Sequence, residues 1–140
     1  MNSLHSLICT QYATDYIEEI KKELEENRNK YDISILNSHS GMREDAELAH
    51  NIGGVDIIIG GHSHLLMEEA EKINDTIIHQ SGSYGEYLGV LDIEVVEGNI
   101  VNFKGQNIKI ESLPMDREII DELIRQKDIA IETLSNPLYE

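Results

Sequence analysis

Residues 31–64 read YDISILNSHSGMREDAELAHNIGGVDIIIGGHSH, and this stretch decides the fold. Residues 31–37 and 55–59 are short runs rich in β-branched side chains, which is typical of buried strands. Between them, residues 43–52 carry apolar side chains at helical spacing, and Gly53-Gly54 marks the end of this helix. A strand–helix–strand order predicts parallel neighbouring strands joined by a right-handed crossover, and therefore an α/β fold.

Histidines follow both predicted strands, in Ser38-His39-Ser40-Gly41 and in Gly60-Gly61-His62-Ser63-His64. Open α/β sheets bind their ligands at the carboxyl ends of their strands, so we expect both loops to lie at one ligand-binding edge. A neutral imidazole is a good ligand for Zn, Mn, Fe, Co or Ni. In an extended segment His62 and His64 would project to the same side. The sequence thus predicts a metal site that contains His39, His62 and His64.

The pair His62–His64 is weak support for a metal site when it is taken alone. Six histidines in 140 residues give a chance His-x-His in about one sequence in four. The alternative is that these histidines are ordinary polar residues of two loops. The position of the loops after buried strands, with glycines that let the backbone approach a ligand, favours the metal site.

The rest of the chain predicts a helix before this unit and a β-rich part after it. Residues 13–28 have the spacing of an amphipathic helix after an irregular start at 1–12. Residues 76–80, 88–96 and 100–110 form three strand-like runs, with Glu97-Gly98-Asn99 as a hairpin turn, and predict an antiparallel β-meander. A terminal helix is expected over 116–134, with Asp116 as its N-cap. The fold class is α/β (α+β).

Composition limits the classes of partner. The chain has 27 acidic and 11 basic side chains and a net charge of −16, so nucleic acid and anionic membranes would repel it. An anionic small molecule needs a cation in its site, and a bound metal is the natural candidate. A single cysteine excludes an internal disulfide, and the sequence contains neither a signal peptide nor a run of about 18 apolar residues. We therefore expect a cytoplasmic chain.

Three segments resemble the calcineurin-like metallophosphoesterases, most closely the branch of 5′-nucleotidases and 2′,3′-cyclic-nucleotide phosphodiesterases. They are DISILNSHSG at 32–41, GVDIIIGGHSH at 54–64 and IHQSGSYGEYLG at 78–89. The resemblance implies a β-sandwich flanked by helices and a two-metal hydrolase that cleaves phosphate esters with a metal-bound hydroxide. It assigns His39 and His62 to one metal and His64 to the other, with Mn, Zn, Fe or Co as candidate ions. Complete members of the family are often exported.

The family's other motifs are absent from the sequence. Its D-x-H, G-D and G-N-H-[DE] motifs have no counterpart, because the 140 residues contain no Asp-x-His, Gly-Asp or Asn-His. We therefore expect residues 1–140 to form one partial domain, the C-terminal half of the sandwich, with no catalytic residue of its own and no assigned substrate-binding residue. Such a chain would be inactive alone and would act on a nucleotide or another phosphate ester only if a separate N-terminal half completed it. A missing half would also expose a sheet edge, so we expect homo-oligomers or pairing with that half. The alternative is a non-catalytic oligomeric or partner-binding remnant.

Other polar residues have simpler interpretations. His79 lies in a predicted strand and is expected to pack or to face the surface, and His50 is expected to be exposed on the helix. Asp45 is expected near a helix start, where a carboxylate is favourable. Tyr84, between Gly82 and Gly85, either shapes a loop beside the metals or packs. Cys9 has no base near it in sequence and is not expected to act as a nucleophile.

Overall fold

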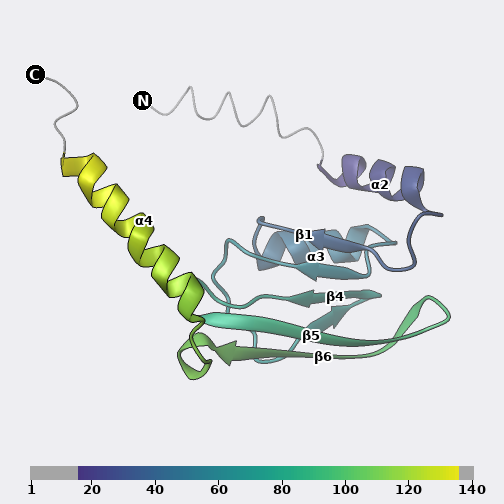
Figure 1. Cartoon of the computed structure of the whole chain (residues 1–140). Helices are drawn as coiled ribbons and strands as arrows, with labels where there is room; N and C mark the ends of the chain where they lie inside the picture. The colour runs from purple at the N-terminus through teal and green to yellow at the C-terminus, as the bar shows by residue number, and fades with distance from the viewer. Residues whose placement is uncertain (1–15, 136–140) are drawn as a thin grey trace, which may run out of the picture. The chain divides into compact units, whose positions relative to one another are not determined.

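A computed structural model describes residues 16–135 of the chain (Figure 1). The elements in chain order are α2 (Tyr16–Asn27), β1 (Ile35–Asn37), α3 (Met42–Asn51), β2 (Ile57–Ile59), β3 (Glu71–Ile73), β4 (Thr76–His79), β5 (Tyr87–Val96), β6 (Asn99–Lys109), a 3₁₀ turn (Ile110–Ser112) and α4 (Arg117–Ser135). The chain divides into two compact units between Ile110 and Glu111. The start of the predicted 13–28 helix and the whole of the irregular segment 1–12 lie outside the described residues.

The first unit contains a four-stranded sheet in the order β1-β2-β4-β3. β1 pairs with β2 in parallel, and α3 connects them, so the strand–helix–strand prediction is confirmed (Figure 1). Ser34 and Asp56 fix the start of this pairing, because the Ser34 amide and hydroxyl each donate a hydrogen bond of 2.8 Å to Asp56 Oδ2. The carboxyl ends of β1 and β2 therefore lie side by side at one edge of the sheet.

The predicted three-stranded meander is wrong in its first strand. β4 pairs in parallel with β2, with Ile58 opposite Ile78, and so belongs to the first sheet. All four residues of β4 are buried, as is typical of a strand covered on both faces, and hydrophobic pattern alone does not tell such a strand from a meander strand. The sheet also contains a strand that the sequence does not predict, β3, which is a short antiparallel edge strand paired with β4.

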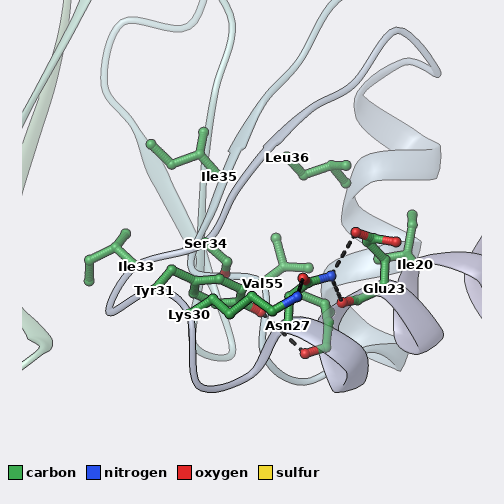
Figure 2. A pocket seen from close by; sticks show the side chains of 11 residues that line it. Ile20, Glu23, Asn27, Lys30, Tyr31, Ile33, Ser34, Ile35, Leu36 and Val55 are labelled. Atoms are coloured by element: carbon green, nitrogen blue, oxygen red, sulfur yellow. Dashed lines mark hydrogen bonds between the residues drawn. The ribbon is translucent and has the colours of Figure 1, made fainter.

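The core of the first unit lies between α3 and the sheet. Its buried side chains are those of Leu48, Ala49, Ile52, Val55, Ile58 and Ile78. α2 packs against this core through Ile17, Ile20 and Leu24, which are partly buried. An open cavity of about 400 Å³ remains between α2 and β1, lined by apolar side chains that include Ile20, Ile35 and Leu36 (Figure 2).

β5 and β6 form a separate antiparallel ribbon in the same unit. Its turn has positive φ at Glu97 (50°) and Gly98 (78°), so the predicted hairpin at 97–99 is confirmed. Asn107 of β6 connects the ribbon to segments that flank the first sheet. Its Nδ2 donates to the carbonyl of Met67, before β3, at 2.6 Å and to that of Gln80, after β4, at 3.2 Å.

The second unit contains α4. Asp116 caps this helix as predicted: its Oδ1 accepts hydrogen bonds from the amides of Glu118 (2.9 Å) and Ile119 (3.3 Å). None of its residues is buried, and Leu123 is 63% exposed. Among residues 16–135, no helix combines the length and the apolar character that a bilayer-spanning helix requires.

Candidate metal centre

Two histidine loops meet at the carboxyl ends of β1 and β2. The Ser38 amide donates to the Ile59 carbonyl (2.9 Å), which continues the β1–β2 pairing up to the first loop. The imidazole rings of His39 and His62 then lie with their centroids 5.4 Å apart, at an interplanar angle of 74°. Gly61 permits this approach, because a Cβ at that position would lie 2.9 Å from His39 Nδ1. The structure thus brings together two of the three predicted histidines.

The second loop is not extended, and this corrects the geometry expected for His62 and His64. Both residues have left-handed backbone conformations, with φ of 68° and 56°. Such conformations cost non-glycine residues on the order of 1–3 kcal/mol each and are concentrated at functional sites. The His64 ring contacts Tyr84 instead of the other two histidines, with centroids 5.4 Å apart and an interplanar angle of 68°.

The loop that carries Tyr84 is hydrogen-bonded to the residues that directly follow His64. The Gly82 amide donates to the Leu65 carbonyl at 3.0 Å, and Leu66 and Ser81 form an isolated antiparallel bridge. Tyr84 itself has φ of 56° and is 88% exposed, so its ring stands open to solvent beside His64. The sequence left two interpretations open for Tyr84. The structure favours the first, a loop residue beside a candidate metal ligand, and excludes the second, because the Tyr84 side chain is not packed in the interior.

A carboxylate lies near the paired rings. Both Glu44 Oε2 and His62 Cδ2 lie close to Gly41, at 3.3 and 3.6 Å from the position of an added Cβ. The pKa of Glu44 is lowered, first by the hydrogen bond from the Arg43 side chain and to a smaller extent by the charge of His62. A hollow of about 200 Å³ beside them is lined by residues that include His39, Ser40 and Glu44. The sequence does not single out Glu44, because its spacing is that of any acidic residue in the first turn of a helix.

The donor set fits only part of a metal site. Two neighbouring imidazoles suit a borderline ion such as Zn, Mn, Fe or Co. Within residues 16–135, however, no three side chains of His, Cys, Asp or Glu converge closely enough to hold an ion. A catalytic ion usually has at least three protein ligands, so further ligands would have to complete this centre.

The remaining polar candidates are placed clearly. His50 is exposed on α3, as expected, and His79 is 3% exposed, so it packs in β4. Asp45 lies in the first turn of α3 as expected, but it is 1% exposed and accepts a hydrogen bond from Ser38 Oγ. Cys9 lies outside the described residues.

Comparison with known proteins reveals relatives of one kind. The chain is 38% identical over 95 residues to the trifunctional nucleotide phosphoesterase YfkN of Bacillus subtilis, covering 66% of this chain and 6% of that protein. It is 33% identical over 83 residues to the metallophosphoesterase YunD of the same organism, and the match covers 59% of this chain and 18% of YunD. It is 29% identical over 134 residues to human 5′-nucleotidase, and the match covers 81% of this chain and 23% of that protein. The chain therefore spans less than a quarter of the length of each of these relatives.

Among solved structures, the sulfate thiohydrolase SoxB of Thermus thermophilus matches with a TM-score of 0.77 and 28% identity, over 91% of this chain and 24% of that one. No protein-family model matches the sequence. These relatives are a nucleotide phosphoesterase, a metallophosphoesterase and a 5′-nucleotidase, and the mixed α/β fold matches the solved structure. The chain belongs to the calcineurin-like metallophosphoesterases, in the branch that contains the 5′-nucleotidases, and corresponds to a part of those proteins.

Proposed function

We propose that this chain contributes His39, His62 and His64 to the divalent metal centre of a phosphate-ester hydrolase. The observation that supports the proposal is the close pairing of His39 and His62, at the ends of two adjacent parallel strands. His64 lies two residues further along the same loop, where it can serve a second ion. Mn, Zn, Fe and Co are the candidate metals, since all accept imidazole nitrogen.

The chemistry divides between the ions and the protein. When bound, divalent ions polarise the phosphoryl oxygens and supply an activated water. This chain's residues hold the ions and fix their position. Because the described donors do not complete a site, the other ligands would come from polypeptide beyond those residues, either a separate half or a longer form of this protein. A positive centre is needed here, since a chain of net charge −16 repels a nucleotide or any other phosphate ester.

Metal titration of histidine variants tests the ligand assignment. We expect His39→Ala and His62→Ala each to weaken binding of Zn²⁺ at least tenfold in isothermal titration calorimetry. His50→Ala is the matched control, because His50 is exposed on α3 outside the paired rings, and it should bind like the wild type. Unchanged affinity in both His39→Ala and His62→Ala would contradict the assignment.

The expected inactivity of the chain alone has its own test. We expect the purified 140-residue chain with Mn²⁺ to release no more p-nitrophenol from an aryl phosphate than its His62→Ala variant does. Substantial turnover that this variant abolishes would overturn the prediction. Adding the part of YunD that this chain does not match should restore hydrolysis if the chain is one half of an enzyme.

A non-catalytic, partner-binding role is the second candidate. It is favoured by the edge position of β1 in the described sheet, where Ile35 is 65% exposed beside an apolar cavity. Under this role the chain would associate with itself or a partner, while the YunD part would give no turnover.

A cytoplasmic location stays a prediction that cell fractionation can test.

A further inference from the structure

Two buried polar side chains reach the histidine loops. Asp45 and Gln80 are each 1% exposed, although both carry strongly polar groups. Asp45 Oδ1 accepts a hydrogen bond of 2.5 Å from Ser38 Oγ, and Gln80 Oε1 accepts one of 2.8 Å from Ser63 Oγ. Ser38 directly precedes His39, and Ser63 lies between His62 and His64. Each histidine loop is therefore anchored to a side chain in the interior.

The same two hydroxyls also receive backbone hydrogen bonds. Ser63 Oγ accepts from the Met42 amide at 3.3 Å, which connects the second loop to the start of α3. Ser38 Oγ accepts from the Ser40 amide at 3.3 Å, which closes the first loop around His39. Each serine thus uses its hydroxyl as donor to a buried side chain and as acceptor from a loop or helix amide.

The second loop needs this support. His62 and His64 both have left-handed backbone conformations, and such conformations persist only where the surroundings hold them. Ser63 is the residue between them. Its hydroxyl bonds to Gln80 and Met42, and its amide bonds to the Gly61 carbonyl at 2.8 Å, so the residue is fixed at three points.

Asp45 and Gln80 converge on Gly60. A Cβ on Gly60 would lie 2.6 Å from Asp45 Oδ2 and 2.6 Å from Gln80 Nε2. Both atoms are buried and lack a hydrogen-bond partner among the described residues. A carboxylate acceptor and an amide donor thus line the same small space beneath the two loops. Proximity to a helix start does not account for this arrangement, because an exposed carboxylate would gain the same favourable interaction with the helix dipole.

We infer that Asp45 and Gln80 are positioning residues for the metal centre. Asp45 acts through Ser38 on His39, and Gln80 acts through Ser63 on His62 and His64. Gly60 provides the space in which both side chains reach the loops. The role in metal binding rests on the proposed function, but the positioning of the imidazole rings can be tested without metal.

The variants remove one anchor at a time. Asp45→Ala and Gln80→Leu delete the acceptors, whereas Asp45→Asn keeps an oxygen for Ser38. Thr76→Val is the matched control, because Thr76 is also buried and its hydroxyl donates to the Val55 carbonyl at 2.7 Å, near the amino ends of the strands. Zn²⁺ affinity is measured by calorimetry, the imidazole signals of the metal-free chain by NMR, and unfolding by urea titration.

We expect Asp45→Ala and Gln80→Leu to weaken Zn²⁺ binding about tenfold or more, the usual range for residues that support metal ligands. Asp45→Asn should recover most of that loss, and Thr76→Val should lower stability without changing affinity. In the metal-free chain, Asp45→Ala should move the His39 signals and Gln80→Leu the His62 and His64 signals.

The two readouts separate the possible failures. If the imidazole signals stay as in the wild type in both folded variants, the positioning inference is overturned. If those signals move but His39→Ala and His62→Ala both leave Zn²⁺ affinity unchanged, the inference about ring positions stands and the proposed metal function fails. A variant that does not fold is replaced by Ser38→Ala or Ser63→Ala, which break the same hydrogen bonds from the less buried partner and should shift the same signals.

Discussion

His39 and His62 lie with their ring centroids 5.4 Å apart, although each follows a different strand of the sheet. This pairing depends on the register Asn37↔Ile59, which brings the ends of β1 and β2 to the same level. The register in turn depends on packing beneath it, because a one-residue slip would turn every side chain of a strand to the other face. The candidate site and the core are therefore parts of one arrangement.

Ile58→Ala should destabilise the first unit strongly. Ile58 is fully buried and faces Ile78 across the β2–β4 pair. Removing a buried isoleucine side chain down to its Cβ costs about 2–5 kcal/mol, a large share of a stability of about 5–15 kcal/mol. Urea unfolding followed by circular dichroism measures the loss. Ile59→Ala, at the 39% exposed neighbouring position, should cost less than half as much, and an equal cost would contradict the burial pattern.

The sequence predicts the strand–helix–strand unit well because its signals are local. β-branched runs, helical spacing and Gly-Gly lie within residues 31–64, and both histidine loops follow from the strand ends. The sequence places β4 in the wrong sheet because a fully buried strand shows the same unbroken apolar pattern in any sheet. β3 was missed because Glu71 and Lys72 give it no apolar alternation.

The side-chain network of the candidate site is harder to predict than its histidines. Asp45 contacts Ser38, and Gln80 contacts Ser63, across different elements. Burial of a polar group depends on tertiary packing, and no sequence spacing distinguishes Asp45 from an ordinary acidic residue in a first helical turn. The left-handed conformation of His62 is equally invisible, since glycine or asparagine is the usual signal for it.

The hairpin turn should respond to substitutions according to its φ angles. Glu97 has φ of 50° and Gly98 has φ of 78°. Left-handed backbone costs ordinary residues about 1–2 kcal/mol, and Asn tolerates it better, so Glu97→Asn should stabilise by about 0.5–1 kcal/mol and Gly98→Ala should destabilise by about 1 kcal/mol. Thermal unfolding of both variants gives the comparison. The same sign of change in both would show that the turn is not of this type.

The ion pair Glu122–Arg125 should give α4 a pH-dependent increment of stability. The Arg125 guanidinium donates to the Glu122 carboxylate at 2.6 and 2.8 Å, and this hydrogen bond is the main cause of the lowered pKa of Glu122. Because the folded pKa lies below the ordinary 4.5, the pair stabilises the helix above about pH 4.5, and the increment disappears as pH falls through the lowered value.

Glu122→Gln isolates that increment. The helical circular dichroism at 222 nm should be slightly stronger in the wild type than in Glu122→Gln at pH 7, and this difference should vanish once the pH has fallen below the lowered pKa of Glu122. Asp128→Asn is the control, since it removes a carboxylate from the same helix and leaves this ion pair intact. A difference that persists at low pH would mean that the variant acts through something other than the ion pair.

The exposed edge at β1 should control self-association. β1 is an outer strand of the described sheet, Ile35 is 65% exposed, and the neighbouring cavity presents apolar side chains of α2 and β1 (Figure 2). Unpaired strand edges and apolar patches favour association, and a lysine on an edge strand opposes it. Ile35→Lys should therefore raise the dissociation constant of a dimer at least tenfold in sedimentation equilibrium while changing the free energy of unfolding by no more than about 0.5 kcal/mol.

Val96→Lys, at a 50% exposed position beside the hairpin turn, is the control, because it adds the same charge elsewhere. If both variants weaken the dimer equally, general charge repulsion is the cause and the β1 edge is not the interface.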